Sequence, residues 1–387
     1  MANQSSAHPI LCASFNQDNS CFAIGTKDGF KIFDCDTGRL LYERVIDDDD
    51  DVIIELDLSG YESSNGIQFL LLAIGAFVIV EMLYRTNLLA IVGAGEQPSL
   101  SPRRLCLFNI VNGTSLRELN FLTSILAVRM DRKRLIVLFK EQTYIYDVNS
   151  LEKKQIIDTV PNVQGLCAFS ACVDNPYLAL PASTTKGSLL VYNVVDLQSH
   201  CEIDAHRSPL IAMAFSSNGT YIATASEHGT IIRVHLISDA TKSYSFRRGT
   251  YSSTIFSLSF GPSADLPDIL LATSSSGSVH IFSLGFDLNE RKSNSLLGSI
   301  IPGSVSDALD PAHHLVFHHA FSAGVRSNAV VQKIEKASGS SNPDPVVLRA
   351  TISMISFSGY YQEYSLRINN KNEATWTLER RSKAIAE

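Results

Sequence analysis

A short motif that ends β-strands recurs along the chain and limits the folds that this sequence can adopt. In each clear copy an aromatic residue lies between a hydrophobic and a polar one. The copies are Ile32-Phe33-Asp34, Leu107-Phe108-Asn109, Ile145-Tyr146-Asp147, Val191-Tyr192-Asn193, Arg233-Val234-His235, Ile281-Phe282-Ser283 and Glu363-Tyr364-Ser365, of which the fifth and the seventh are degenerate. Their central residues are 75, 38, 46, 42, 48 and 82 positions apart. Four of these spacings lie in or near the range of about 40–45 residues that a four-stranded propeller blade requires.

Turn signals separate the expected strands. Examples are Lys27-Asp28-Gly29, Lys186-Gly187-Ser188, His228-Gly229-Thr230 and Ser276-Gly277-Ser278. A glycine in such a turn allows the positive φ with which the chain enters the next strand of a hairpin. We therefore predict an all-β fold, a seven-bladed β-propeller of WD40-like repeats, as a single domain over residues 1–387. A closed or nearly closed ring would remove most exposed sheet edges.

The two long spacings predict insertions. Residues 45–72 have no counterpart in the blade pattern, and they include the run Asp47–Asp51. We interpret that run as a solvated loop rather than a cation site, because like charges repel and keep such a run extended. The last long spacing holds residues 285–312 of blade six and the Ser/Gly/Pro-rich stretch 337–345, which is typical of a flexible loop in blade seven.

Composition and charge exclude several classes of protein. The net charge of −7 disfavours general nucleic-acid binding, which needs a basic surface. Seven cysteines without a C-x-x-C pair predict neither a zinc site nor a disulfide framework. The two histidine pairs, at 313–314 and 318–319, fit no common metal-ligand spacing and are interpreted as strand or loop histidines. The amino terminus does not resemble a signal peptide. The apolar run 67–80 has 14 residues, fewer than the roughly 20 of a spanning helix, and is expected to be buried core in a cytosolic protein.

The pattern that suggests a ligand site is Phe246-Arg247-Arg248-Gly249, between the fifth and sixth blades. Arginine recognises phosphate through a planar fork of fixed donors. Successive side chains in a strand point to opposite faces, so Arg247 and Arg248 are expected to face two separate crevices as charges on the rim. Phe246 is expected to wedge between blades, and Gly249 to let the chain leave the strand. An isolated arginine pair is more often a solvated surface feature, so this pattern alone leaves both interpretations open.

In its blade context this motif resembles the signature of the PROPPIN family, β-propellers that bind polyphosphoinositides. Further segments resemble the family's blades two, five and six, and the tail resembles a plant branch of the family. These segments are residues 80–93, 223–234 and 277–282, with 310–314 and 360–364 in the tail. The run Thr250-Tyr251-Ser252-Ser253 departs from the more polar or charged family pattern, which leaves a partner in the second site open.

The resemblance implies two sites, for phosphatidylinositol 3-phosphate and phosphatidylinositol 3,5-bisphosphate. Turn hydroxyls can donate to phosphate oxygens, and a bound phosphate can raise the pKa of a histidine until it becomes a second cation. The alternative is that the histidine is a structural turn residue and that the hydroxyls cap backbone groups. The first site would comprise Arg247, His206, Ser226 and Thr230, and the second Arg248, Ser275 and Ser278.

The resemblance also implies a membrane-inserting loop in blade six. Four aliphatic side chains suit this role, since none has an obvious core partner and each can enter the lipid interface; packing on the propeller is the alternative. They are Leu296, Leu297, Ile300 and Ile301.

These features predict a peripheral membrane protein that is not an enzyme and needs no cofactor. The resemblance implies a scaffold in autophagy that moves from the cytoplasm to the phagophore assembly site or to endosomal or vacuolar membranes. It also implies an autophagy-related lipid-transfer protein as partner. The alternative is a protein-interaction propeller scaffold without lipid binding. An enzyme is disfavoured because no convergent acid, base or metal residues and no common catalytic motif occur.

Overall fold

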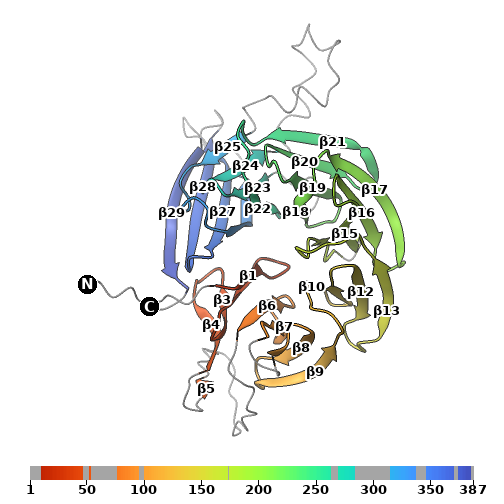
Figure 1. The fold of residues 1–387 in the computed structure, drawn as a ribbon. Helices are drawn as coiled ribbons and strands as arrows, with labels where there is room; N and C mark the ends of the chain where they lie inside the picture. Colours follow the sequence, from red (N-terminus) through yellow and green to blue (C-terminus); the bar gives the residue numbers. More distant parts are fainter. Residues whose placement is uncertain are drawn as a thin grey trace, which may run out of the picture.

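The strands of this protein form seven antiparallel sheets around a common axis (Figure 1). The computed structural model describes residues 10–46, 52–53, 76–95, 100–172, 174–262, 269–283, 314–336, 346–369 and 374–384. Within these ranges every sheet is built from strands that are consecutive in the chain, six sheets having four strands and the first having five. The predicted all-β, seven-bladed propeller is therefore confirmed.

The first three blades contain the following strands. Blade one has β1 (Cys12–Phe15), β2 (Cys21–Gly25), β3 (Gly29–Asp34), β4 (Leu40–Ile46) and β5 (Val52–Ile53). Blade two has β6 (Phe77–Met82), β7 (Leu88–Gly93), β8 (Arg104–Asn109) and β9 (Thr114–Asn120). Blade three has β10 (Ala127–Met130), β11 (Arg134–Leu138), β12 (Gln142–Asp147) and β13 (Lys153–Asp158).

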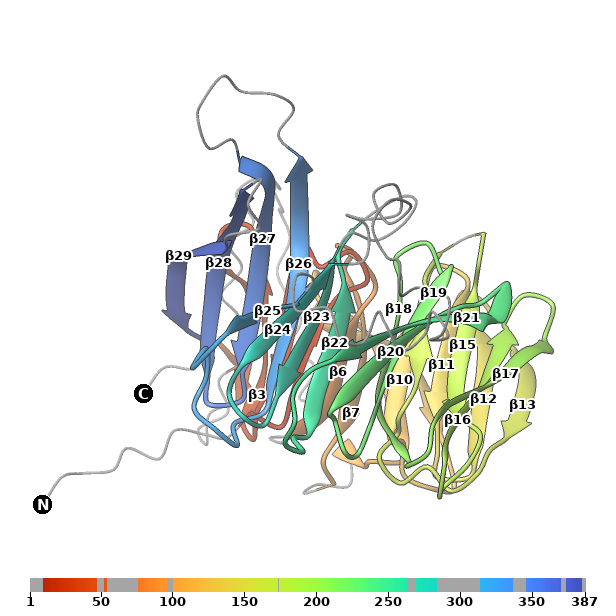
Figure 2. The ribbon, with the colours of Figure 1, turned by 90° about the horizontal axis from the view of Figure 1, so that it is seen from above.

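The remaining four blades follow the same order. Blade four has β14 (Ala168–Phe169), β15 (Tyr177–Pro181), β16 (Gly187–Asn193) and β17 (Gln198–His206). Blade five has β18 (Leu210–Phe215), β19 (Tyr221–Ser226), β20 (Ile231–Leu236) and β21 (Asp239–Arg247). Blade six has β22 (Ile255–Phe260), β23 (Ile269–Ser274), β24 (Val279–Ser283) and β25 (His314–Phe317). Blade seven has β26 (Ser327–Lys336), β27 (Val346–Ser356), β28 (Tyr360–Asn369) and β29 (Ala374–Lys383), and β26 and β27 extend past the neighbouring sheet (Figure 2).

Each motif found in the sequence lies on the third strand of its blade. Its central side chain is buried in six blades, and Tyr192 of blade four is half-buried against a cluster from blades three and four. The motif therefore marks the position at which the third strand fills the space between neighbouring sheets. This packing role explains why the fifth copy is tolerated, where buried Val234 replaces the aromatic residue.

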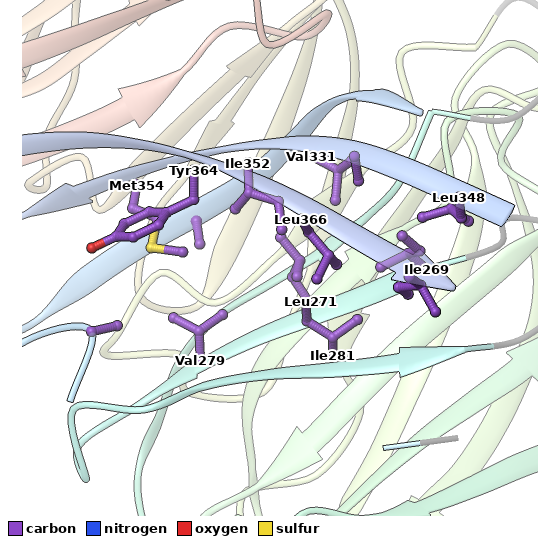
Figure 3. Close-up of a cluster of buried hydrophobic side chains, with 14 residues drawn as sticks. Ile269, Leu271, Val279, Ile281, Val331, Leu348, Ile352, Met354, Tyr364 and Leu366 are labelled. Carbon is purple, nitrogen blue, oxygen red and sulfur yellow. The ribbon is translucent and has the colours of Figure 1, made fainter. Parts of the chain in front are cut away.

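The hydrophobic core is divided among the contacts between blades. Figure 3 shows the contact of blades six and seven, in which Leu271 and Ile281 face Ile352 and Leu366. Fully burying one such aliphatic side chain contributes about 1.5–3 kcal/mol. Neighbouring blades cover the inner strands on both faces, so β2 and β23 are fully buried, whereas the outer strands β9 and β13 are largely exposed.

Blades seven and one close the ring without sharing a strand. The chain enters on the first strand of blade one and leaves on the last strand of blade seven, so side chains must join these two sheets. The rings of Phe22 and Tyr361 stack with centroids 4.9 Å apart. The Tyr361 hydroxyl donates to the Cys35 carbonyl at 2.9 Å, and the Asn328 amide donates to the Ala13 carbonyl at 2.9 Å.

The first residues of the predicted insertion 45–72 belong to blade one. Val45 and Ile46 belong to β4, and the short strand β5 pairs with them as a fifth strand of blade one. Residues 54–72, the run Asp47–Asp51, the segment 285–312 and the stretch 337–345 lie outside the described residues. The apolar run 67–80 ends inside β6, and no helix in the described ranges is long and apolar enough to cross a membrane.

Glycine is required in the blade turns for two different reasons. Gly229 and Gly277 have φ values of 57° and 78°, as predicted. Gly187 does not have a positive φ, so the prediction was wrong there. A Cβ on Gly187 would lie 2.5 Å from the Cβ of His206, so close approach of the outer strand excludes a side chain.

We expect Tyr361→Phe to lower the free energy of unfolding by about 1–3 kcal/mol. The substitution leaves the buried Cys35 carbonyl without its donor and removes the contact to the Ser353 hydroxyl at 2.9 Å. Urea unfolding measures the difference. Tyr251→Phe is the matched control, because Tyr251 is 86% exposed. Equal stability of the two variants would show that this hydroxyl is not part of the ring closure.

Candidate functional site

Arg247 ends β21 at the edge of blade five, and its side chain is exposed. It forms a cross-strand pair with Ile231, and Arg233 lies two residues further along β20. Arg233 and Arg247 therefore project from the same face of the sheet. Among the described residues Arg247 has neither a hydrogen-bond nor an ion-pair partner. The exposed Arg247 guanidinium, which contacts no described polar group, therefore lies on the same face as the Arg233 guanidinium.

Arg233 is a basic residue of this face that the sequence analysis did not identify. Its guanidinium donates to the Ala205 carbonyl of blade four and, at 3.4 Å, to the Ser245 hydroxyl. Burial and the nearby charge of Arg207 lower its pKa. In the sequence, Arg233 is the first residue of a degenerate copy of the strand motif, so nothing marked it as a candidate site residue. Only the β20–β21 register shows that it shares a face with Arg247.

His206 ends β17 and reaches across to blade five. Its Nε2 lies 3.0 Å from the Thr224 hydroxyl and 3.2 Å from the Thr224 carbonyl. Burial, followed by the charge of Arg233, lowers the pKa of His206 to about 4. The imidazole is therefore neutral at pH 7 in this structure, and Arg233 is a cation next to it.

Ser226 and Thr230 flank the turn between β19 and β20. The Gly229 amide donates to the Ser226 carbonyl at 2.8 Å and closes this turn. Ser226 lies two residues beyond Thr224, so alternation places its side chain on the face that His206 contacts. The structure therefore brings the hydroxyl residues of the predicted first site to the turn beside Arg247.

Arg248 is not the exposed rim charge that was expected. It is 8% exposed, and its backbone amide donates to the Thr230 carbonyl at 2.8 Å. Its guanidinium donates to the Gly229 carbonyl at 2.5 Å and to the Tyr251 carbonyl. Burial lowers its pKa. The chain turns back after β21, so this guanidinium is enclosed by backbone carbonyls.

The two serines of the predicted second site lie in the turn between β23 and β24. The Ser275 hydroxyl is 2.9 Å from the Ser253 hydroxyl and accepts the Thr254 amide at 3.0 Å. Ser278 is buried, and its carbonyl faces the Ser274 hydroxyl at 3.5 Å. Ser253, from the run that departs from the family pattern, thus contacts a residue of the predicted second site.

Two histidines of blade six lie on the Arg248 side of blade five. His280 Nδ1 and His314 Nε2 are 2.9 Å apart, and their rings stack. Burial lowers the pKa of His280 to about 3 and that of His314 to about 4, and the charge of Arg248 contributes to both shifts. Arg247 therefore faces blade four, whereas Arg248 faces blade six. No cluster of three or more metal-ligating side chains occurs in the described part of the chain.

The other predicted residues have different outcomes. Phe246 is buried and packs between blades five and six, with its ring centroid 5.2 Å from that of Phe282. A Cβ on Gly249 would meet no described atom within 4 Å, so this turn does not require glycine for space. The membrane-loop residues Leu296, Leu297, Ile300 and Ile301 lie outside the described residues.

Fold and site together define a seven-bladed propeller that places two arginines on opposite sides of its fifth blade. The PROPPIN family model matches residues 63–304, and the chain belongs to the PROPPIN family. It is 64% identical over 384 residues to autophagy-related protein 18b of Arabidopsis thaliana, covering 98% of this chain and 97% of that protein. The resemblance to a plant branch of the family is thereby confirmed.

More distant relatives and solved structures agree. Autophagy-related protein 18 of Dictyostelium discoideum is 38% identical over 284 residues, 73% of this chain and 68% of that protein. Kluyveromyces lactis Hsv2 with its complete loop 6CD has a TM-score of 0.68 at 18% identity, covering 98% of this chain and all of that one. KlAtg21, solved in complex with the coiled coil of AgAtg16, has a TM-score of 0.68 at 22% identity, covering 97% and 99%. The relatives are named as autophagy-related proteins and not as enzymes, so the chain is an autophagy-related propeller.

We expect the protein to lose stability as the pH falls from about 6.5 toward 4. Burial lowers the pKa values of His206, His235 and His314 to about 4 and that of His280 to about 3. The folded state keeps these histidines neutral, whereas the unfolded chain binds protons from about pH 6.5 downward. Each of these histidines therefore contributes to the free energy of unfolding above about pH 6.5. That contribution is lost as the pH falls, because the unfolded chain binds protons that the folded protein does not.

Buried Glu81 opposes this trend. Burial raises its pKa to about 7, so the stability it contributes is present at low pH and is lost as the pH rises toward 7. Urea unfolding at pH 7.5, 6.5, 5.5 and 4.5 measures the balance, and His280→Asn should flatten the curve. Stability that stays constant between pH 7 and 5 would refute the dominance of the histidines.

Proposed function

We propose that this chain is a peripheral membrane protein that binds phosphatidylinositol 3-phosphate and phosphatidylinositol 3,5-bisphosphate and acts as a scaffold in autophagy. One observation carries the proposal. The exposed Arg247 has no partner among the described residues and lies on the same face as Arg233, next to the turn that carries Ser226 and Thr230. Two guanidinium groups that share a face and form no ion pair with a described carboxylate are suited to a phosphate group.

The chemistry of this face supports an anion as ligand. Arg233 is desolvated, so its charge is screened less than that of a freely exposed side chain. The Nε2 of neutral His206 contacts Thr224, and a bound phosphate would favour the protonated form, in which both ring nitrogens carry a proton. The chain belongs to the PROPPIN family. This membership supports the same ligand, because PROPPINs are β-propellers that bind polyphosphoinositides.

A second site at Arg248, Ser275 and Ser278 and a loop carrying Leu296, Leu297, Ile300 and Ile301 complete the proposal. One headgroup at one exposed site holds a protein weakly on a membrane. Several weak contacts on one rigid body act together through a high effective concentration. Membrane retention would therefore depend on both lipid sites and on the loop.

The proposed location follows from the lipids. The protein would move from the cytoplasm to the phagophore assembly site or to endosomal and vacuolar membranes. An autophagy-related lipid-transfer protein is the proposed partner. KlAtg21 is a propeller of similar fold that was solved with a coiled coil, which supports a helical protein partner for this fold.

The second candidate function is a protein-interaction propeller without lipid binding. It is supported by the same coiled-coil complex and by Arg248, whose donors contact backbone carbonyls in place of a ligand. Flotation of the parent protein on liposomes with and without 3-phosphorylated lipid distinguishes the two. Equal flotation on both would favour the protein-interaction function.

Arg247→Ala should reduce flotation on liposomes that contain phosphatidylinositol 3-phosphate by about tenfold or more. The substitution removes a charge-assisted contact of roughly 1.5–3 kcal/mol without disturbing an internal hydrogen bond. Arg247→Lys should restore binding in part, since it keeps the charge but loses the planar fork. Arg117→Ala, an exposed arginine on β9 of blade two, is the matched control. An Arg247→Ala protein that floats like this control would exclude Arg247 from the site.

Replacing Leu296, Leu297, Ile300 and Ile301 together by Ser should weaken flotation while leaving soluble headgroup binding unchanged. Each buried aliphatic contributes at most about 1.5–3 kcal/mol, and partial insertion contributes less. Calorimetry with the headgroup and liposome flotation measure the two effects separately. Undiminished flotation of the fourfold variant would show that the loop is not an anchor.

A further inference from the structure

The Arg248 side chain links the turn between β19 and β20 to the segment that follows β21. Its Nε donates to the Gly229 carbonyl at 2.5 Å, in the turn that ends with Thr230. Its terminal nitrogen donates to the Tyr251 carbonyl, in the segment that leads from blade five to blade six. A planar guanidinium holds both carbonyls at a fixed separation.

The same two segments are in direct backbone contact. The Ser253 amide donates to the His228 carbonyl at 3.2 Å. A Cβ on Gly229 would lie 1.8 Å from the Ser253 carbonyl oxygen, so the backbones touch where only glycine fits. The Ser253 hydroxyl then continues to Ser275 at 2.9 Å. One hydrogen-bonded framework therefore runs from the Thr230 turn to the turn of blade six.

Arg248 makes internal contacts that Arg247 does not make. Its guanidinium is buried and contacts carbonyls, and among the described residues it has no carboxylate partner. Arg247, one residue earlier, has the opposite character, since it is exposed and contacts no described polar group. Adjacent arginines of one motif thus have different environments.

We propose that Arg248 is a positioning residue for the Arg247 site. It holds the Gly229–Thr230 turn and residues 249–253 in place, so that the Thr230 hydroxyl and the end of β21 keep the separation that a phosphate requires. This inference rests on the proposed function. Alternation along the strand directs Arg247 and Arg248 to opposite faces of blade five. The hydrogen bonds from the Arg248 side chain to backbone carbonyls nevertheless connect its face to the turn beside Arg247.

The test uses the full chain with Ser278→Ala, which weakens the second site and leaves the contact between Ser253 and Ser275 in place. Soluble inositol 1,3-bisphosphate is the probe. In this background, independent sites predict that Arg248→Ala does not change the affinity of the first site. Positioning predicts that calorimetry finds about tenfold to hundredfold weaker binding at the first site, since small misplacements have effects of that size. Tyr251→Ala is the control, because it removes an exposed side chain and keeps the carbonyl that Arg248 contacts.

Salt dependence separates positioning from direct contact. Arg247→Ala should flatten the dependence of affinity on salt, since a charge contact is lost. Arg248→Ala should weaken binding but leave that slope unchanged. Unaltered affinity in Arg248→Ala, or a slope flattened as in Arg247→Ala, would overturn the proposal.

Arg248→Lys keeps the test decisive if Arg248→Ala does not fold. Lysine retains the charge but cannot hold two carbonyls with a planar fork. We expect intermediate affinity, together with faster hydrogen exchange of the Arg248 and Ser253 amides, which donate into the blade-five turn. Parent-like affinity and exchange in Arg248→Lys would refute positioning. Absence of headgroup binding by the otherwise unaltered chain would instead refute the proposed function, and this inference with it.

Discussion

The packing of sheet against sheet between neighbouring blades is the interaction on which the rest of this structure depends. A four-stranded blade is too small to bury an apolar face by itself, and every blade here is covered on both faces by its neighbours. Closure has to follow from the same packing, because blades one and seven share no strand. The stack of Phe22 on Tyr361 and the bond from the Tyr361 hydroxyl to Cys35 provide it.

The candidate site lies where this apolar packing ends. Within blade five, Ile232 and Phe246 fill the contact with blade six, and the next residues of the strand leave the core. Arginine side chains at this edge are only partly desolvated, so they avoid the free-energy cost of burying a full charge. Arg233 contacts the backbone of blade four, and Arg248 contacts the Gly229 carbonyl of blade five and the Tyr251 carbonyl of the segment that follows it. The rigid ring thus fixes charged groups that a loop alone would leave mobile.

The difference between Arg247 and Arg248 shows how far strand alternation determines a site. Alternation correctly assigns them to opposite faces, one toward blade four and the other toward blade six. It does not determine their exposure. The segment after β21 turns back over Arg248, and the Gly229 and Tyr251 carbonyls become its partners. His206 shows the same limit, since its neutral state follows from burial against Thr224 and from the charge of Arg233.

The sequence by itself determined the number of blades, the strand that carries each repeated motif, and the motif that identifies the family. These properties are local, because a strand ending and a glycine turn depend on residues within one hairpin. Only the tertiary structure decided that Arg233 shares a face with Arg247, that Arg248 is buried and that Ser253 contacts Ser275. Each depends on strand register or on contact between blades. The physical reason is that burial and hydrogen-bond partners come from segments that are distant in the chain, and their arrangement is not written in any one repeat.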